Sequence, residues 1–411
     1  MRVALESRAP DKLSVCIYNR YARTAGGGEK YSLAIADVLE GAARVDLLTH
    51  DPIDIASLAR RLRLRLTHLG VQYVDDDDAA VSRASARYDL FINASYMSVV
   101  PSRARRSVAL VYFPNPLFAS RWALHKARAE RAVRRLGAFR CRRSPSHAAD
   151  GTPLTPLEAL GTYDAIWAVS EYSRRWIRRY WGHDAQVLYP PVDVDHLQPA
   201  AKLPLILSVG RFFRSGHTKR QDALVEATRA LARDLAGGWH VVLAGGMGHN
   251  PSEWQYFEDV QAAARGLPVT LWPNVPAQAL AELYAHAAVY WHAAGFGRDE
   301  HTDPARMEHF GITTVEAMAA GCVPLVYDAG GQAEIVAPGV DGYRWRSLDD
   351  LVQLTRTVIA DASLRARLAR AATLSARRFS GDLFATRVSS MVAALLDGAP
   401  SRSIDALAAS G

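Results

Sequence analysis

The sequence contains few cysteines and no long apolar run. Its three cysteines, Cys16, Cys141 and Cys322, lie far apart and form no CxxC pair. A disulfide framework or a structural zinc site is therefore not expected, and a reducing compartment fits this pattern. No stretch reaches the ~20 apolar residues of a membrane-spanning helix, and residues 1–14 lack an apolar core of signal-peptide length. We expect a cytoplasmic protein, either free or peripheral at the inner face of the membrane.

Acidic residues are outnumbered by basic ones, 42 to 49, which gives a formal net charge of +7. This excess favours an anionic partner, and a diphosphate substrate, an acidic lipid surface and nucleic acid are all compatible with it. The length of 411 residues suggests about two or three domains. Hydrophobic residues make up 49% of the chain, which is enough for two cores.

Short runs rich in Val, Ile and Leu alternate with amphipathic stretches along the whole chain. Strands are predicted at residues 13–18, 44–49, 88–94, 108–113, 165–169, 186–189, 205–209, 240–244, 269–272, 289–292 and 323–327. Helices are predicted at residues 29–39, 220–235, 254–265, 277–287, 314–320, 348–359, 364–379 and 383–396. This alternation predicts an α/β protein with parallel sheets and right-handed crossovers.

Prolines interrupt the alternation at residues 190–204. They cannot continue a helix or a central strand, so we interpret this segment as a linker. The predicted parts are an N-terminal Rossmann-like domain (1–189), the linker (190–204), a C-terminal Rossmann-like domain (205–380), and a crossing helix with a tail (381–411).

Basic side chains dominate residues 121–143, where Glu130 is the one acid. Trp122 and Leu136 fall near one face of a helix drawn through this segment. A basic helix with an apolar stripe can lie on an anionic membrane or hold an acidic acceptor. The alternative is a solvated basic helix packed on a sheet.

Three glycines, Gly26, Gly27 and Gly28, follow the first predicted strand and precede the first predicted helix. Glycines there let the backbone approach a ligand closely, and a helix N-terminus offers N–H groups to anionic oxygens. The alternative is a flexible loop. The pattern is not the GxGxxG fingerprint, so NAD binding is not predicted.

Two cations follow the strand predicted at residues 205–209, namely Arg211 and Lys219. Ligands of open α/β sheets bind at the carboxyl ends of strands. A guanidinium fork and a compact ammonium together suit a diphosphate. The alternative is ordinary surface basicity.

Two carboxylates, Glu308 and Glu316, are separated by seven residues across a loop that turns into a helix. The amides of residues 311–313 would lie at the helix N-terminus, which favours phosphate. Glu316 would lie in the first turn and bind a ribose diol, while Glu308 would meet sugar hydroxyls. The alternatives are a capping box between Thr313 and Glu316 and a solvated Glu308.

Residues 308–321 resemble the Glu-x7-Glu signature of retaining glycosyltransferases of family 4, which have the GT-B fold, two Rossmann-like domains facing each other across a cleft. The resemblance extends to Val209–Arg211, Lys219, Gly26–Gly28, Tyr189–Asp193, Trp291–Gly295 and Gly330–Ile335. It covers nearly the whole chain and is more specific in the second half.

The resemblance implies a role for each matching residue. The catalytic residues would be Arg211 and Lys219, which hold the diphosphate, and Glu308, which contacts the transferred sugar. The donor-binding residues would be Gly27, Gly28, Phe310, Gly311, Ile312, Thr313 and Glu316. The family needs no metal or other cofactor for the transfer.

The resulting hypothesis is a retaining, metal-independent hexosyltransferase in cell-surface polysaccharide synthesis. Its partners would be GDP-mannose or a UDP-hexose, a glycan or lipid-linked acceptor, and a membrane surface touched by residues 121–143; nucleic acid is not expected. The alternatives are a nucleotide-sugar epimerase on the same fold and a non-catalytic nucleotide or nucleic-acid binder.

Some positions leave alternatives open. Many relatives have a histidine after the fourth strand, where this chain has residues 111–116 without one, so Tyr112 or Asn115 is the candidate replacement. His292 ends a predicted strand and either touches the donor sugar or is a satisfied core histidine. Two acidic runs, 75–78 and 193–195, could hold a metal but fit solvated loops better.

Overall fold

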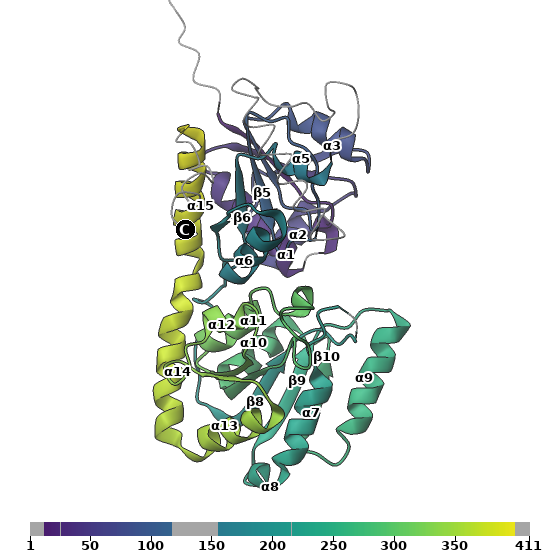
Figure 1. Cartoon of the computed structure of the whole chain (residues 1–411). Helices are drawn as coiled ribbons and strands as arrows, with labels where there is room; N and C mark the ends of the chain where they lie inside the picture. The colour runs from purple at the N-terminus through teal and green to yellow at the C-terminus, as the bar shows by residue number, and fades with distance from the viewer. Residues whose placement is uncertain (1–11, 25, 117–154, 215, 399–411) are drawn as a thin grey trace, which may run out of the picture. The chain divides into compact units, whose positions relative to one another are not determined.

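The computed structural model of the chain describes residues 12–24, 26–116, 155–214 and 216–398 (Figure 1). The basic segment 121–143, with its predicted membrane or acceptor role, lies outside the described residues. The chain divides into two compact units. The first comprises Met1–Val169, Ser173–Leu188 and Ala385–Gly411, and the second comprises Ser170–Tyr172 and Tyr189–Phe384.

The first unit is built on a seven-stranded parallel sheet with the order β3-β2-β1-β4-β5-β6-β7. Its strands are β1 (Ser14–Tyr18), β2 (Arg44–Thr49), β3 (Gly70–Tyr73), β4 (Leu90–Asn93), β5 (Arg106–Val111), β6 (Ala165–Ala168) and β7 (Gln186–Val187). Its described helices are η1 (Ala22–Thr24), α1 (Gly27–Leu39), α2 (Ile55–Leu62), α3 (Asp78–Ser85), α5 (Pro156–Leu160), α6 (Glu171–Trp181, from Ser173 on) and α15 (Gly381–Leu396, from Ala385 on).

The second unit has a six-stranded parallel sheet with the order β10-β9-β8-β11-β12-β13. Its strands are β8 (Leu203–Val209), β9 (His240–Gly245), β10 (Val269–Pro273), β11 (Ala287–His292), β12 (Val323–Tyr327) and β13 (Tyr343–Trp345). Its described helices are α7 (Gln221–Ala230), α8 (Ala232–Leu235), α9 (Pro251–Ala263), α10 (Ala277–His286), η2 (Pro304–Arg306), α11 (Ile312–Ala319), α12 (Gln332–Ile335), α13 (Leu348–Ala360), α14 (Ala362–Ala376) and η3 (Arg377–Phe379).

The strand order of the second sheet reverses between β8 and β11. The chain runs outward from β8 through β9 to β10 and then returns to β11, which pairs with β8. In open parallel sheets, the crevice beyond the carboxyl ends of the strands at such a reversal is where ligands bind. A ligand is therefore expected at the loops that follow β8 and β11.

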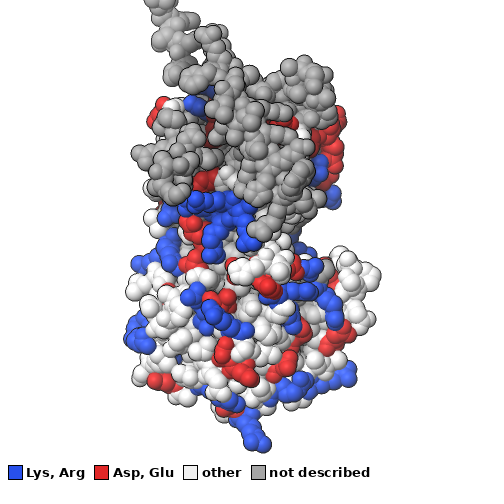
Figure 2. Space-filling view, in the orientation of Figure 1, with Lys and Arg blue, Asp and Glu red and all other residues white. Residues whose placement is uncertain are grey.

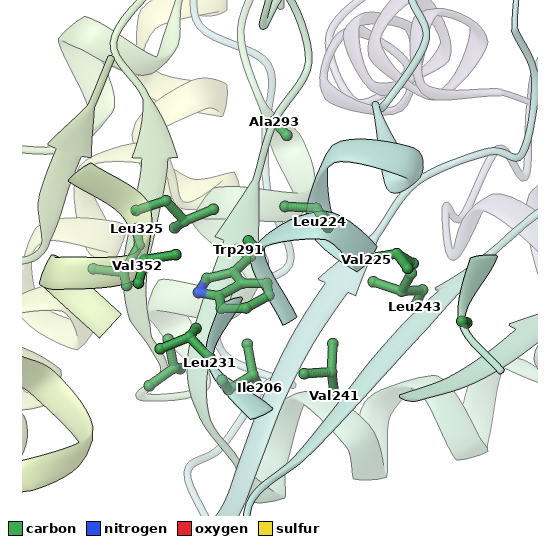
Figure 3. Close-up of a cluster of buried hydrophobic side chains, with 14 of the residues drawn as sticks. Ile206, Leu224, Val225, Leu231, Val241, Leu243, Trp291, Ala293, Leu325 and Val352 are labelled. Carbon is green, nitrogen blue, oxygen red and sulfur yellow. The ribbon is translucent and has the colours of Figure 1, made fainter. Parts of the chain in front are cut away.

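Strand β11 runs through the middle of the hydrophobic core, and every one of its residues is buried. Trp291 lies among Ile206, Leu325 and Val352 from neighbouring elements (Figure 3). Its indole N–H donates to Thr355 Oγ1 at 3.1 Å, which satisfies the one polar atom of the side chain. This packing fixes the position of the next residue, His292, which is the last residue of β11.

Most predicted strands and helices are present, with ends that shift by a few residues. The short edge strands β3 and β13 were not predicted, because neither is a continuous apolar run. The helix predicted at residues 220–235 is interrupted at Leu231, which separates α7 from α8.

Candidate active site

The loop after β8 is closely packed around Gly210. A Cβ atom at this position would lie 2.4 Å from Cγ of Lys219, so only glycine lets the backbone lie against the lysine stem. The Gln221 side-chain amide, at the start of α7, donates to the carbonyl oxygens of Gly210 (3.1 Å) and Arg211 (3.2 Å). These contacts hold Lys219 at the carboxyl end of β8.

Lys219 and Glu308 form an ion pair between Nζ and Oε2, which joins the loop after β8 to the loop before α11. Nε2 of His292 lies 3.2 Å from the same carboxylate oxygen. Burial by itself would raise the pKa of Glu308, but the Lys219 charge and the His292 hydrogen bond outweigh it and hold that pKa well below its usual range. Glu308 is therefore an anion at neutral pH.

Helix α11 begins at a turn that requires glycine. Gly311 has a φ of 122°, and a Cβ atom there would lie 2.1 Å from Nε2 of Gln332. Gly311 is the N-cap residue and provides no side-chain cap. The first N–H groups of any helix have no partner within the helix, and such groups attract anions. The amides of Ile312 and Thr313 therefore suit a phosphate oxygen.

The capping box considered for Thr313 and Glu316 is wrong. The helix begins at Ile312, so Thr313 lies inside it, beyond the N-cap position. The Thr313 hydroxyl instead accepts a hydrogen bond from Tyr290 at 2.8 Å, because the end of β11 packs against this turn. The Glu316 carboxylate accepts one from the Tyr284 hydroxyl at 2.9 Å. Glu316 was predicted to lie in the first turn of the helix, but it lies past that turn.

Phe310 is a packing residue. Its side chain is 3% exposed, and its ring lies 5.7 Å from that of Tyr189 and 5.1 Å from that of Phe379, measured between ring centroids. Any contact between Phe310 and a donor would therefore involve its backbone. The buried ring anchors the loop that carries Glu308.

Arg211 has other partners than the Lys219–Glu308 pair. Its guanidinium lies 3.8 Å from the Glu253 carboxylate and 5.4 Å from the centre of the Phe213 ring. The side chain is 68% exposed, so it can reorient at little cost. The structure thus brings Lys219 and Glu308 together directly. Arg211 is held in the same loop as Lys219 by the Gln221 amide, which donates to its carbonyl oxygen.

Gly27 and Gly28 belong to the first unit. Helix α1 begins at Gly27, so both glycines lie in its first turn, and the expectation that they form a loop is wrong. The Glu29 carboxylate accepts a hydrogen bond from the Gly26 amide at 2.7 Å and caps the helix. The Tyr112 hydroxyl donates to the Gly28 carbonyl at 2.8 Å.

The acidic run 75–78, considered as a metal site, has structural partners. Asp77 caps α3 by accepting from the amides of Ala79 and Ala80, and Asp76 pairs with Arg20. In the parts of the chain that the structure describes, no group of three or more His, Cys, Asp or Glu side chains is arranged to hold a metal ion. Within the same residues, no helix has both the length and the apolarity to cross a bilayer.

Sequence reasoning missed several residues of this site. Tyr284, Tyr290 and Gln332 each contact a predicted site residue or the turn that carries it. The two tyrosines are buried in apolar elements, so their sequence signal is that of core residues. Gln332 lies within the stretch Gly330–Ile335 that the resemblance included, but nothing in the sequence indicates that it packs under Gly311.

Residues 193–375 match the family model described as glycosyl transferases group 1. The chain is 29% identical over 178 residues to an α-1,3/1,6-mannosyltransferase, ALG2, of Rhizomucor pusillus, a match that spans 37% of this chain and 39% of the relative. It is 25% identical over 240 residues to a mouse (Mus musculus) GDP-Man:Man(3)GlcNAc(2)-PP-Dol α-1,2-mannosyltransferase, a match that spans 54% of this chain and 46% of the relative. Each match therefore spans less than half of the relative's length.

The fold is that of known GT-B structures. Crystalline HepE of Anabaena, in complex with UDP and glucose, matches with a TM-score of 0.65 at 16% identity, over 93% of this chain and 100% of that one. The predicted fold class, α/β with two parallel sheets of the GT-B type, is confirmed. The resemblance to GT-B glycosyltransferases is also confirmed, while the family number stays a prediction.

Proposed function

Because residues 193–375 match the family model of glycosyl transferases group 1, we propose that this chain transfers a hexose from a nucleotide-diphosphate sugar to a glycan or lipid-linked acceptor. Retention of the anomeric configuration and independence from metal are parts of the proposal. GDP-mannose is the first donor to test, because both relatives described above are mannosyltransferases. A UDP-hexose is the second, because the HepE structure holds UDP and glucose.

The observation that carries the proposal is the pairing of Lys219 with Glu308 next to the start of α11. An ammonium group has three N–H donors, so one can hold Glu308 while the others reach phosphate oxygens. Negative charge collects on the diphosphate as it leaves, and fixed donors aimed at that charge lower the barrier. The Glu308 carboxylate would stabilise the positive charge that develops on the sugar.

The chemical step balances without a protein nucleophile. The bond between the anomeric carbon and the diphosphate oxygen breaks, and its electron pair goes to the diphosphate. The acceptor hydroxyl oxygen bonds to the same face of the anomeric carbon, and its proton passes to the leaving phosphate. Lys219, Arg211 and the α11 amides would stabilise the products of this step electrostatically.

The direct test is a transfer assay with the full chain, GDP-mannose or UDP-glucose as donor, and octyl glycosides of mannose, glucose and galactose as acceptors. We expect acceptor-dependent release of the nucleoside diphosphate, a product with the donor's anomeric configuration, and an unchanged rate in EDTA. Release of an altered free sugar without acceptor would identify an epimerase. Activity that EDTA removes and Mn²⁺ restores would contradict metal independence.

For nucleic-acid binding, the non-catalytic alternative, Figure 2 bears on one face of the second unit. A nucleic-acid interface gathers Lys and Arg on one face. On the face of the second unit seen in Figure 2, blue Lys and Arg side chains are interspersed with red Asp and Glu. The cytoplasmic location and the membrane contact of residues 121–143 stay predictions that accompany the proposed acceptor.

A further inference from the structure

His292 is a buried residue that the proposed chemistry does not use. It ends β11, its side chain is 3% exposed, and Nε2 lies 3.2 Å from Oε2 of Glu308. Its other ring nitrogen, Nδ1, is buried and has no hydrogen-bond partner among the described residues. Such a pattern needs a physical reason, because buried polar atoms are nearly always paired.

The protonation of the pair follows from its surroundings. Glu308 is an anion, and a carboxylate can only accept hydrogen bonds. Burial lowers the pKa of His292, so its ring is neutral and carries one N–H. That N–H must be at Nε2, where it donates to Glu308, and Nδ1 is then an unpaired acceptor. Nε2 of Gln332, 3.5 Å from Nε2 of His292, is also a donor, so this contact is not a hydrogen bond.

The unpaired Nδ1 of this imidazole does not serve stability. An unpaired buried acceptor destabilises a fold, whereas an apolar side chain of similar size would fill the same space without that penalty. What only the imidazole supplies is an uncharged N–H aimed at Glu308 from a fixed strand end. Lys219, by contrast, has a flexible four-carbon stem, and under the proposed function its charge is shared with a diphosphate.

We propose that His292 is a positioning residue, whose Nε2–H holds the Glu308 carboxylate in the orientation in which it faces the donor sugar. This inference rests on the proposed function. It assigns His292 an indirect role through Glu308, in place of the direct contact with the sugar considered from the sequence. Because the ring is neutral, it orients the carboxylate without neutralising its charge.

Other titratable groups also surround Glu308 and enter any pH profile. Lys219 pairs with it, and His217 and His309 lie near it, with their rings in edge-to-face contact at 4.5 Å between centroids. Burial lowers the pKa of both of these histidines, so they stay neutral at lower pH than an ordinary histidine does. Only His292 donates to Glu308 as a neutral group within the described contacts.

The test compares three substitutions in the full chain. His292→Leu removes the donor at similar volume, His292→Gln keeps an N–H near the Nε2 position, and His292→Asn places its amide near the Nδ1 position. The measurements are kcat and KM with GDP-mannose (UDP-glucose if UDP proves to be the bound nucleotide), the dissociation constant of the matching nucleoside diphosphate, and the thermal midpoint.

We expect His292→Leu and His292→Asn to lower kcat roughly ten- to hundredfold, the effect of losing a hydrogen bond to a charged group. His292→Gln should recover most of that loss. Nucleotide affinity and thermal midpoint should change little in all three. In the Leu variant the pKa of Glu308 should rise, so the acidic limb of kcat should move to higher pH.

A Leu variant with the kcat of the unsubstituted chain would overturn the inference, as would a Gln variant as slow as the Leu variant. Equal losses of kcat, nucleotide affinity and thermal midpoint would show that His292 is merely structural. If the unsubstituted chain transfers no sugar from either donor, the proposed function fails and this inference fails with it. Normal transfer by the unsubstituted chain, together with an unchanged kcat in the His292→Leu variant, would contradict only the inference about His292.

Discussion

Glu308 takes its ionisation state from two residues on different elements of the second unit. Lys219 comes from the loop after β8 and His292 from the end of β11, and both contact the same carboxylate oxygen. The sequence pattern identified Lys219 and Glu308 separately, but nothing in their spacing shows that they pair. Contacts between residues so far apart in the chain depend on the register of β8 and β11, which a single sequence does not specify.

Replacing Lys219 tests the electrostatic part of the account. Lys219→Ala should lower turnover about 10²–10³-fold, by analogy with removal of a donor that stabilises a leaving group. Arg211→Ala should have an effect of similar size. The matched control is Arg356→Ala, because Arg356 is a half-exposed cation on α13 that pairs with Asp234. Steady-state turnover near that of the control variant would refute the assignment of Lys219.

The buried histidines predict how stability depends on pH. Burial lowers the pKa of His217 and of His292, and it lowers that of His309 to about 3. The unfolded chain binds protons at these sites near pH 6.5, so the folded state loses stability as the pH falls below that value. Each such histidine can change the free energy of unfolding by at most about 1.4 kcal/mol per pH unit.

Two carboxylates modify this dependence in different windows. Glu308, with its lowered pKa, adds to the loss only below about pH 4.5, near its unfolded value. Burial raises the pKa of Glu334, so the folded state takes up this proton at a higher pH than the unfolded state does. Glu334 therefore opposes the loss of stability that the histidines cause as the pH falls. We expect the thermal midpoint to fall as the pH is lowered from 7 to 5. The fall should be smaller in the His309→Gln variant, which lacks one of the three histidines. A midpoint that stays constant over this range would contradict the assignment of neutral buried histidines.

At the scale of elements, α11 shows why a local motif can mislead. The sequence around Thr313 and Glu316 has the spacing of a capping box, yet the helix starts at Ile312 because Gly311 adopts a positive φ. Contacts with Gln332 and Tyr290 determine this start. Long apolar runs, such as β11 and β12, were predictable because burial on both faces leaves a continuous signal, whereas the short edge strands β3 and β13 leave none.

A substitution at Gly311 tests the turn that presents the α11 amides. Gly311→Ala should destabilise the chain by about 1–3 kcal/mol through backbone strain, plus a clash with Gln332, 2.1 Å from the added Cβ. It should also weaken nucleoside diphosphate binding. Gly339→Ala is the matched control, because its φ of 77° is also positive but no atom lies within 4 Å of its Cβ. If both variants lose the same amount in thermal midpoint, the close packing around Gly311 has no effect on stability, and this account of the turn is wrong.

At the scale of the whole molecule, the alternation of apolar runs and helices was enough to predict two parallel sheets, and the comparison with HepE confirms that fold class. The predicted domain limits and the roles of the site residues stay predictions. Contacts such as that of Tyr112 with Gly28 could not be predicted, since they join residues on different elements of the first unit. Sequence patterns give the elements, and tertiary packing then decides which side chains meet.

The central claim is that Lys219, Glu308 and the start of α11 form a binding site for the diphosphate of a sugar donor. Thermal melts with GDP, UDP, ADP and dTDP test it most directly, in the unsubstituted chain and in Lys219→Ala. A nucleotide at 100 times its dissociation constant should stabilise the chain by about 2.7 kcal/mol. We predict such a shift with GDP, or with UDP, and its loss in Lys219→Ala. No shift with any of the four nucleotides, or an equal shift in both proteins, would contradict the claim.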